Sequence, residues 1–195
     1  MKVAGSFGGS WLTEVEAAIQ YAENAGFDFA GTPETSHDAM LAAAIAINAT
    51  SRIEVQTGVT IAFPRSPMVL AMEAWDLQHL SKGRFSLGLG TQVKGHIQRR
   101  FGVPWTAPAP RIKEYIRTMR AIWDNFQNGG KPDFVGEHYQ YTLTSPTFNP
   151  GPIDFPAPKV FLACVGDGMA RAAGEVADGV LPHGFMTDKF MREVV

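Results

Sequence analysis

Three histidines and one glutamate stand where this sequence could do chemistry. Each follows a short run of alternating or apolar residues that predicts a β-strand. Glu34 and His37 follow residues 27–31, His96 follows residues 85–90, and His183 follows residues 179–181. A neutral imidazole titrates near physiological pH, so it can take a proton from a substrate hydroxyl. We therefore expect His37 to be a general acid or base, with Glu34 and His96 as further catalytic candidates.

Each of these residues also has a structural interpretation. Asp38 or Ser36 could cap the helix that follows, which would leave His37 exposed beside a capping cluster. Glu34 could be a second general base, a group that orients His37, or a surface carboxylate. His96 could donate to a cofactor or substrate oxygen, or pair with loop backbone. A metal-dependent hydrolase is the weakest alternative, because no histidine pair has ligand spacing; no metal site is expected.

The run at residues 85–90 alternates apolar side chains with Ser86, Gly88 and Gly90. Glycine weakens a strand interior, so two of them indicate that another group lies close to the backbone. Tight strand packing alone is the simpler explanation. The polar residues 91–96 follow without an obvious apolar helix. A strand that ends in glycines and opens into such a loop is typical of a ligand site in an α/β protein.

Two familiar glycine motifs are absent from this stretch. A dinucleotide fingerprint would need Gly or Ala at the position of Val93, with a helix opening inside the motif. A P-loop would need Lys and Ser or Thr after Gly95, where the chain has His96 and Ile97. Any cofactor at this strand is therefore bound in another way.

The composition predicts a globular protein of the reducing cytoplasm. The chain has 195 residues and a net charge of −2, which gives no electrostatic case for nucleic acid or an anionic membrane. Its one cysteine, Cys164, excludes an internal disulfide and is interpreted as a buried apolar residue. Residues 1–4 read as a strand rather than a signal peptide, and no apolar run approaches membrane length. We expect a small-molecule substrate, with homo-oligomerisation left open.

Strands and helices alternate along the chain. Strands are expected at 1–7, 27–31, 53–61, 85–90, 159–165 and 179–181, and helices at 11–25, 38–49, 66–83, 110–128, 168–176 and from 187. Thr13 with Glu16 predicts a capping box, and Ser66 with Pro67 a second helix start. Such alternation indicates a parallel sheet, and polar residues after most strands favour a barrel over an open doubly wound sheet. Eight units need about 250 residues, so one barrel domain over 1–195, C-terminally incomplete, is expected.

Five motifs then narrow the fold. They are DLQHLSKGRFSLGLG at residues 76–90, Gly26-Phe27-Asp28, Thr57-Gly58-Val59, Phe134-x-Gly136-x-x-Tyr139 and GEVADG at residues 174–179. Together they resemble the bacterial luciferase-like superfamily, especially its coenzyme F420-dependent oxidoreductases, in order along nearly the whole chain. The resemblance implies a (β/α)8 TIM-type barrel of which about six units are present. It also implies that residues 131–158 are the insertion segment of the family and that the chain is an N-terminal fragment.

The resemblance implies a flavin-type cofactor across the carboxyl-terminal mouth of the barrel. By it, Gly58 and Val59 form a cis peptide behind the ring, and Thr91 and His96 line the ring and active site. Val165 and Gly166 form a backbone turn that approaches the cofactor, and His183 is assigned to the same site. Val93 replaces the acid of F420-dependent sugar-phosphate dehydrogenases, which argues against that reaction and leaves the proton-transfer group open.

The expected function is hydride transfer between coenzyme F420 and a small organic substrate. An FMN-dependent monooxygenase that uses molecular oxygen is the alternative within the same fold. A deazaflavin cannot form the oxygen adduct that FMN can, so the identity of the cofactor decides the chemistry. An inactive, truncated cofactor-binding chain is a third possibility.

Overall fold

A curved parallel sheet organises the protein. The computed structural model describes residues 2–7 and 11–194, so residue 1 of the first expected strand and residue 195 of the last expected helix lie outside it. The strands are β1 (Ala4–Ser6), β2 (Phe29–Thr32), β3 (Glu54–Thr57), β4 (Thr60–Ile61), β5 (Phe85–Gly90), β6 (Phe134–Val135), β7 (Gln140–Tyr141), β8 (Lys159–Cys164) and β9 (Gly179–Pro182). The helices are α1 (Val15–Asn24), α2 (Ala39–Ala49), α3 (Pro67–Leu80), α4 (Lys94–Arg99), α5 (Pro108–Asn128), α6 (Asp167–Val176) and α7 (Asp188–Val194), with 3-10 turns η1 (Leu12–Glu14) and η2 (Pro146–Phe148).

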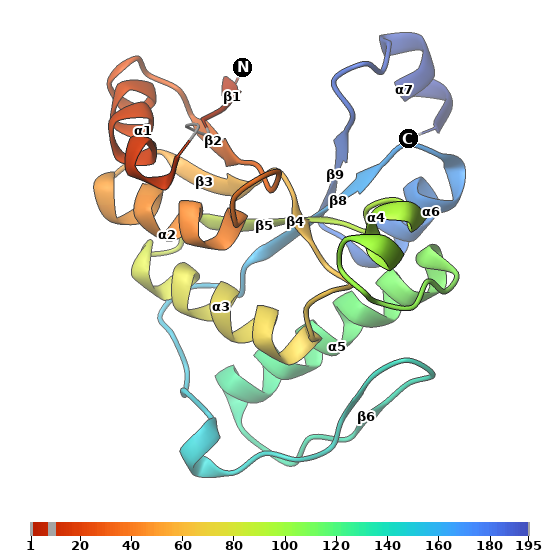
Figure 1. The fold of residues 1–195 in the computed structure, drawn as a ribbon. Helices are drawn as coiled ribbons and strands as arrows, with labels where there is room; N and C mark the ends of the chain where they lie inside the picture. The colour runs from red at the N-terminus through yellow and green to blue at the C-terminus, as the bar shows by residue number, and fades with distance from the viewer. Residues whose placement is uncertain (1, 8–10, 195) are drawn as a thin grey trace.

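The order of the strands confirms the predicted partial barrel. Within the described residues the main sheet runs β1-β2-β3-β5-β8-β9, with all pairs parallel and β4 pairing beside β5. The large helices follow the strands around one side, because α1 contacts α2, α2 contacts α3, α3 contacts α5, and α5 contacts α6. Figure 1 shows the first and last strands at opposite ends of the curved sheet. The protein is therefore an α/β half-barrel.

Local sequence signals set the starts of helices α2 and α3. Asp38 Oδ1 accepts the backbone N–H groups of Met40 and Leu41 at 2.8 and 3.0 Å, so Asp38 is the N-cap of α2. Ser66 caps α3, with Pro67 at its first position, as expected. The capping box predicted for Thr13 and Glu16 is wrong. The 3-10 turn η1 comes first, and Glu14, rather than Glu16, accepts the backbone N–H of Trp11.

Two other differences affect the mouth of the barrel. The strand expected at 53–61 is split into β3 and β4 by Gly58–Val59, which is a cis peptide as the family resemblance implied. The segment after β5, expected to be a loop, contains the short helix α4. Ile97 is its only fully buried side chain, so the segment shows too little apolar periodicity to predict a helix.

The two strand glycines are required by close neighbours. A Cβ at Gly88 would lie 1.9 Å from the carbonyl oxygen of Thr57 on β3, and one at Gly90 would lie 2.6 Å from Val59 Cγ2. The Thr57 hydroxyl also donates to the Gly88 carbonyl at 2.8 Å and accepts its N–H at 3.0 Å. The prediction that another group approaches this backbone is therefore confirmed. At Gly88 that group is the backbone of β3, and at Gly90 it is the side chain of Val59, between β3 and β4.

At the amino ends of the strands, two charged side chains form hydrogen bonds to backbone groups. Arg84, at the start of β5, donates to three carbonyls within residues 47–53 at 2.7 to 3.3 Å. Glu23 Oε1 accepts three successive backbone N–H groups at residues 51–53, at 2.6 to 3.0 Å. In a parallel barrel this end serves stability, whereas the carboxyl end carries the site.

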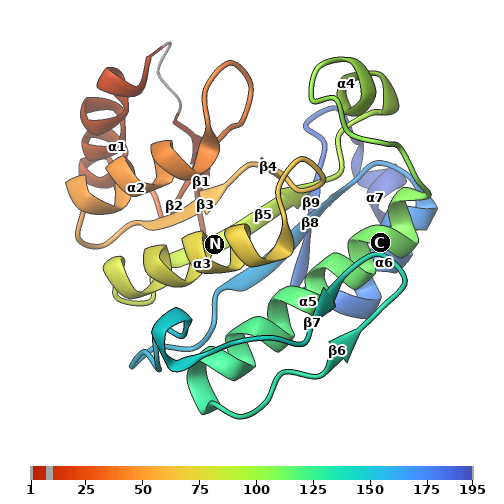
Figure 2. The same ribbon diagram turned by 60° about the horizontal axis from the view of Figure 1, so that its bottom comes forward.

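The hairpin β6–β7 in the expected insertion is held along α5 (Figure 2). Glu114 accepts the backbone N–H groups of residues 137–139 at 2.6 to 3.0 Å. A Cβ at Gly136 would lie 2.2 Å from Glu114 Oε1, so glycine keeps this carboxylate in place. Arg111 donates to the Tyr139 hydroxyl at 2.8 Å. The Gly and Tyr of the Phe-x-Gly-x-x-Tyr motif therefore serve as anchors of the hairpin; that residues 131–158 form an insertion stays a prediction.

Candidate functional site

The carboxyl ends of all parallel strands meet at one edge of the sheet, and the candidate residues follow those ends. Thr32 on β2 is paired with Thr57 on β3, and Leu89 on β5 with Leu162 on β8. Cys164 on β8 is paired with Pro182 on β9. The segments after these strands therefore share one face, which we call the mouth.

One side of the mouth contains a cavity of about 390 Å³, here called the His37 cavity. It is lined by Glu34, Thr35, Ser36, His37, Asp38, Pro64, Arg65, Arg100 and Phe101. Glu34 and His37 thus line one cavity, as expected. The His37 ring packs on the ring of Trp11, with centroids 5.3 Å apart. Asp38 caps α2 as the structural interpretation had it, and His37 is half-buried rather than exposed.

Arg65 connects two carboxylates of this cavity. Its Nη1 donates to Glu34 Oε1 at 2.9 Å and to the Ile61 carbonyl at 3.0 Å, while Nη2 donates to Asp38 Oδ2 at 2.5 Å. Glu34 Oε2 accepts the backbone N–H of Ile61 at 3.0 Å. Both oxygens of Glu34 are therefore occupied by β4 and Arg65, which suits a holding role better than that of a general base. Burial alone would lower the pKa of Arg65, but the bonds to Glu34 and Asp38 raise it overall.

The other side of the mouth contains an apolar cavity of about 630 Å³, here called the Val165 cavity. It is lined by Val165, His183, Phe185, Met186, Thr187 and Phe190. Two residues predicted to bind the cofactor, Val165 and His183, therefore come together. His183 Nδ1 accepts the N–H of Phe185 at 3.3 Å, so a neutral ring carries its proton on Nε2.

Two glycines at the mouth leave room for a flat ligand. A Cβ added at Gly58 or at Gly166 would have no atom within 4 Å. Both are exposed, and neither has a positive φ, so their lack of a side chain is not required by backbone conformation. Open space over backbone at two strand ends fits a planar ring that approaches closely.

Thr91 and His96 line neither of the two cavities. The Thr91 hydroxyl donates to the Gln92 carbonyl at 3.4 Å, and His96 is exposed on α4. Both lie beyond the carboxyl end of β5, beside the mouth. Their assignments to the cofactor ring and to catalysis stay predictions.

The remaining expectations concern absent or buried groups. In residues 2–7 and 11–194, no three His, Cys, Asp or Glu side chains are placed to hold a metal ion. No helix in that part of the chain is long and apolar enough to cross a membrane. Cys164 is buried, as expected, and burial raises the pKa of its thiol.

Glu73 on α3 is a partly buried carboxyl whose pKa responds to Arg65, Asp38 and Glu34. Its Oε2 is buried with no hydrogen-bond partner among the described residues. Burial raises its pKa, Arg65 lowers it in part, and Asp38 and Glu34 raise it further. A carboxyl whose pKa is raised by folding stabilises the protein fully below its unfolded pKa, and that contribution is lost as pH rises through the folded pKa.

We therefore expect Glu73→Gln to gain stability relative to the wild type as pH rises from about 4 to 7. Glutamine keeps the shape of the side chain without the buried charge. Urea unfolding at a series of pH values measures the difference in unfolding free energy between the two proteins. A difference that does not change with pH would show that Glu73 does not titrate abnormally.

The geometry of the mouth can now be compared with known proteins. Residues 4–195 match the luciferase-like monooxygenase family along nearly the whole chain. This chain belongs to that family. It is 43% identical to an uncharacterised protein of Mycobacterium tuberculosis, over 100% of this chain and 57% of that protein. It is 32% identical to a putative coenzyme F420-dependent oxidoreductase of the same species, over 84% of this chain and 49% of the relative.

Two solved structures share the fold. The monooxygenase RslO1 from Streptomyces bottropensis superposes with a TM-score of 0.81 at 19% identity, over 100% of this chain and 63% of the other. The coenzyme F420-dependent tetrahydromethanopterin reductase from Methanopyrus kandleri gives a TM-score of 0.70 at 22% identity, over 94% and 55%. The chain thus forms part of a luciferase-like TIM barrel, and it spans about half the length of the curated relatives it matches.

Sequence reasoning did not place four residues that are distant in sequence, Pro64, Arg65, Arg100 and Phe101, in the His37 cavity. Arg100 Nη2 donates to the Thr35 carbonyl at 2.7 Å. An arginine between a strand end and a helix N-cap, as at Arg65, was the available signal. It does not reveal which carboxylates the arginine binds.

Proposed function

We propose that this family member binds coenzyme F420 at the mouth and transfers hydride between it and a small organic substrate. The open space over Gly58 and Gly166 carries the proposal, because it exposes backbone at two strand ends where a flat ring can lie. The apolar Val165 cavity is lined by the residue that precedes Gly166 and suits a ring system. A relative of the chain is named as a putative F420-dependent oxidoreductase, which supports F420 over other ring cofactors.

The residues present give each part of this site a role. Gly58, Val59 and Gly166 would lie against the ring, and Val165 and His183 would bound it on the side of β8 and β9. The bound deazaflavin supplies the hydride donor or acceptor. His37 would hold or take the proton of the substrate oxygen, and Glu34, through Arg65 and Ile61, would hold the segment that carries it.

Titration of the purified chain with F420 and, separately, with FMN tests the proposal. Absorbance and fluorescence of each ring report binding, and F420 is expected to bind more tightly. FMN is the alternative because a neighbour of similar fold, a Baeyer–Villiger monooxygenase, is solved with FMN. Tighter binding of FMN would move the proposal to oxygen chemistry. Binding of neither would overturn it.

Gly166→Thr sharpens this test. Threonine caps a helix about as well as glycine, and Gly166 is the N-cap of α6 with φ −126°, so folding should be retained. Its branched side chain would fill the open space, and the affinity for the ring should fall about tenfold or more. Gly174→Ala, at an exposed helical glycine with equally open space, is the control and should bind as the wild type does. Unchanged affinity in Gly166→Thr would place the ring elsewhere.

A further inference from the structure

We propose that Arg65 is a positioning residue of the mouth, which fixes the His37 segment against the segment that runs from Gly58 to Arg65 itself. The catalytic consequence of this role rests on the proposed function, whereas the contacts that define the role do not. Nothing in the motifs of the chain assigns a role to this arginine.

First, the guanidinium of Arg65 joins the loop after β2 to the end of β4. Through Glu34 and Asp38, Arg65 holds residues on both sides of His37, and through the Ile61 carbonyl it holds the end of β4. Glu34 adds a second bond to the Ile61 N–H. The loop after β2 is therefore tied to the strand end after Gly58–Val59 at several points.

The second argument is burial. The side chains of Arg65 and Glu34 are 16% and 8% exposed, so their interaction is poorly screened by solvent. Asp38 is more exposed, at 36%, and its other oxygen caps α2. Removal of one partner from such a group leaves charge without compensation, so the loop would reorganise rather than keep its geometry.

The third argument is that the backbone of Arg65 is itself fixed. The hydroxyl of Tyr115, a fully buried residue of α5, donates to the Arg65 carbonyl at 3.2 Å. The guanidinium therefore extends from an anchored backbone to the loop that carries His37. An arginine held in this way transmits the position of α5 and β4 to His37.

The test uses Arg65→Met and Arg65→Lys, with Arg84→Met as the matched control. Arg84 is a half-buried arginine at the opposite end of the strands, bonded to backbone carbonyls. Hydrogen–deuterium exchange should show the N–H groups of Met40, Leu41 and Ile61 exchanging about 10–100-fold faster in Arg65→Met. In Arg84→Met these three should change no more than the global unfolding measured in urea.

The lysine variant keeps the charge but lacks the fork that reaches two carboxylates. It should fold as the wild type does. Its N–H groups at Ile61, or at Met40 and Leu41, should still exchange faster than in the wild type. Wild-type protection of all three amides in both Arg65 variants, after correction for global stability, would overturn the proposal.

Titration with F420 and FMN separates this inference from the proposed function. If the wild type binds a ring cofactor, Arg65→Met should weaken binding or lower turnover by up to about 10²-fold, as misplacement of a site does. If the wild type binds neither while the amides still lose protection, the positioning role stands and the proposed function fails. Unchanged protection with normal cofactor binding leaves the proposed function intact and rejects the role of Arg65.

Discussion

Gly88→Ala is expected to be the most destabilising single-methyl change in the sheet. The new Cβ would lie 1.9 Å from the Thr57 carbonyl oxygen and 2.7 Å from Leu181 Cδ1. The first neighbour is backbone of the adjacent strand, so it cannot rotate away as a side chain can. Strands β3 and β5 must separate, with loss of both Thr57–Gly88 hydrogen bonds. We expect the free energy of unfolding to fall by about 3–5 kcal/mol.

Urea unfolding followed by circular dichroism measures this loss. Gly174→Ala serves again as the control, because its methyl enters open space on the exposed face of α6 and favours the helix. A Gly88→Ala protein within about 1 kcal/mol of the wild type would show that the two strands can move apart without cost. The close approach would then not be the reason for glycine at this position.

His37→Ala is expected to have the largest effect on activity. If His37 holds the proton of the substrate oxygen, its removal should lower turnover by about 10²–10⁴-fold, with a much smaller change in cofactor affinity. Loss of the visible absorbance of F420 as a reduced substrate transfers hydride to it provides the assay. The ring also packs on Trp11, so the variant should lose that contact as well.

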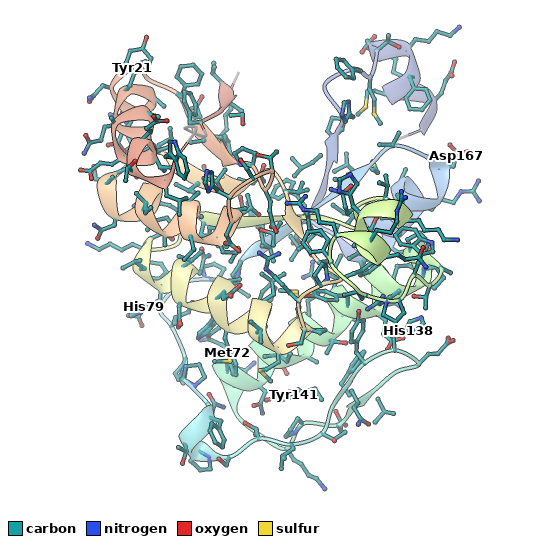
Figure 3. The ribbon with its side chains drawn as sticks, viewed as in Figure 1. Tyr21, Met72, His79, His138, Tyr141 and Asp167 are labelled. Carbon is teal, nitrogen blue, oxygen red and sulfur yellow. The ribbon has the colours of Figure 1, made fainter. Side chains whose placement is uncertain are left out.

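His79→Ala is the control for this experiment. His79 lies in the last turn of α3, at the amino ends of the strands and away from the mouth, and Figure 3 labels it there. It is exposed, so its replacement should change neither turnover nor stability appreciably. If His37→Ala retains the turnover of the wild type, His37 serves only the entry to α2.

The elements that sequence predicted well are those with strong local signals. Asp38 and Ser66 set helix starts because their side chains accept backbone N–H groups of the first helical turn. In β5, Gly88 and Gly90 indicated that other groups lie close to the strand. Weak local signals account for two errors. Helix α4 was missed because it buries only Ile97, and the break between β3 and β4 was missed because β4 has two residues and shows no period of its own.

The site was predictable in position but less so in partnership. Parallel strands bring their carboxyl ends to one edge, so topology placed His37 and His183 near the mouth, and the family resemblance placed Val165 there. The partner of Glu34 was not, because Arg65 lies 31 residues away in sequence and their pairing depends on the bend after β4. Side-chain pairing across loops is a tertiary property that local pattern does not encode.

The curvature of the sheet sets the width of the mouth. Within the described residues β1 pairs only with β2 and β9 only with β8, so no strand pairing joins the two ends (Figure 1). The His37 cavity and the Val165 cavity lie on two walls connected through the intervening strands and the helices packed on them, and their separation follows the curvature of the sheet. A ligand that contacts both walls would fix the distance between them. The free energy of binding then includes both the direct contacts and the cost of holding the sheet at one curvature. Substitutions far from the ligand that alter this curvature are therefore expected to change its affinity.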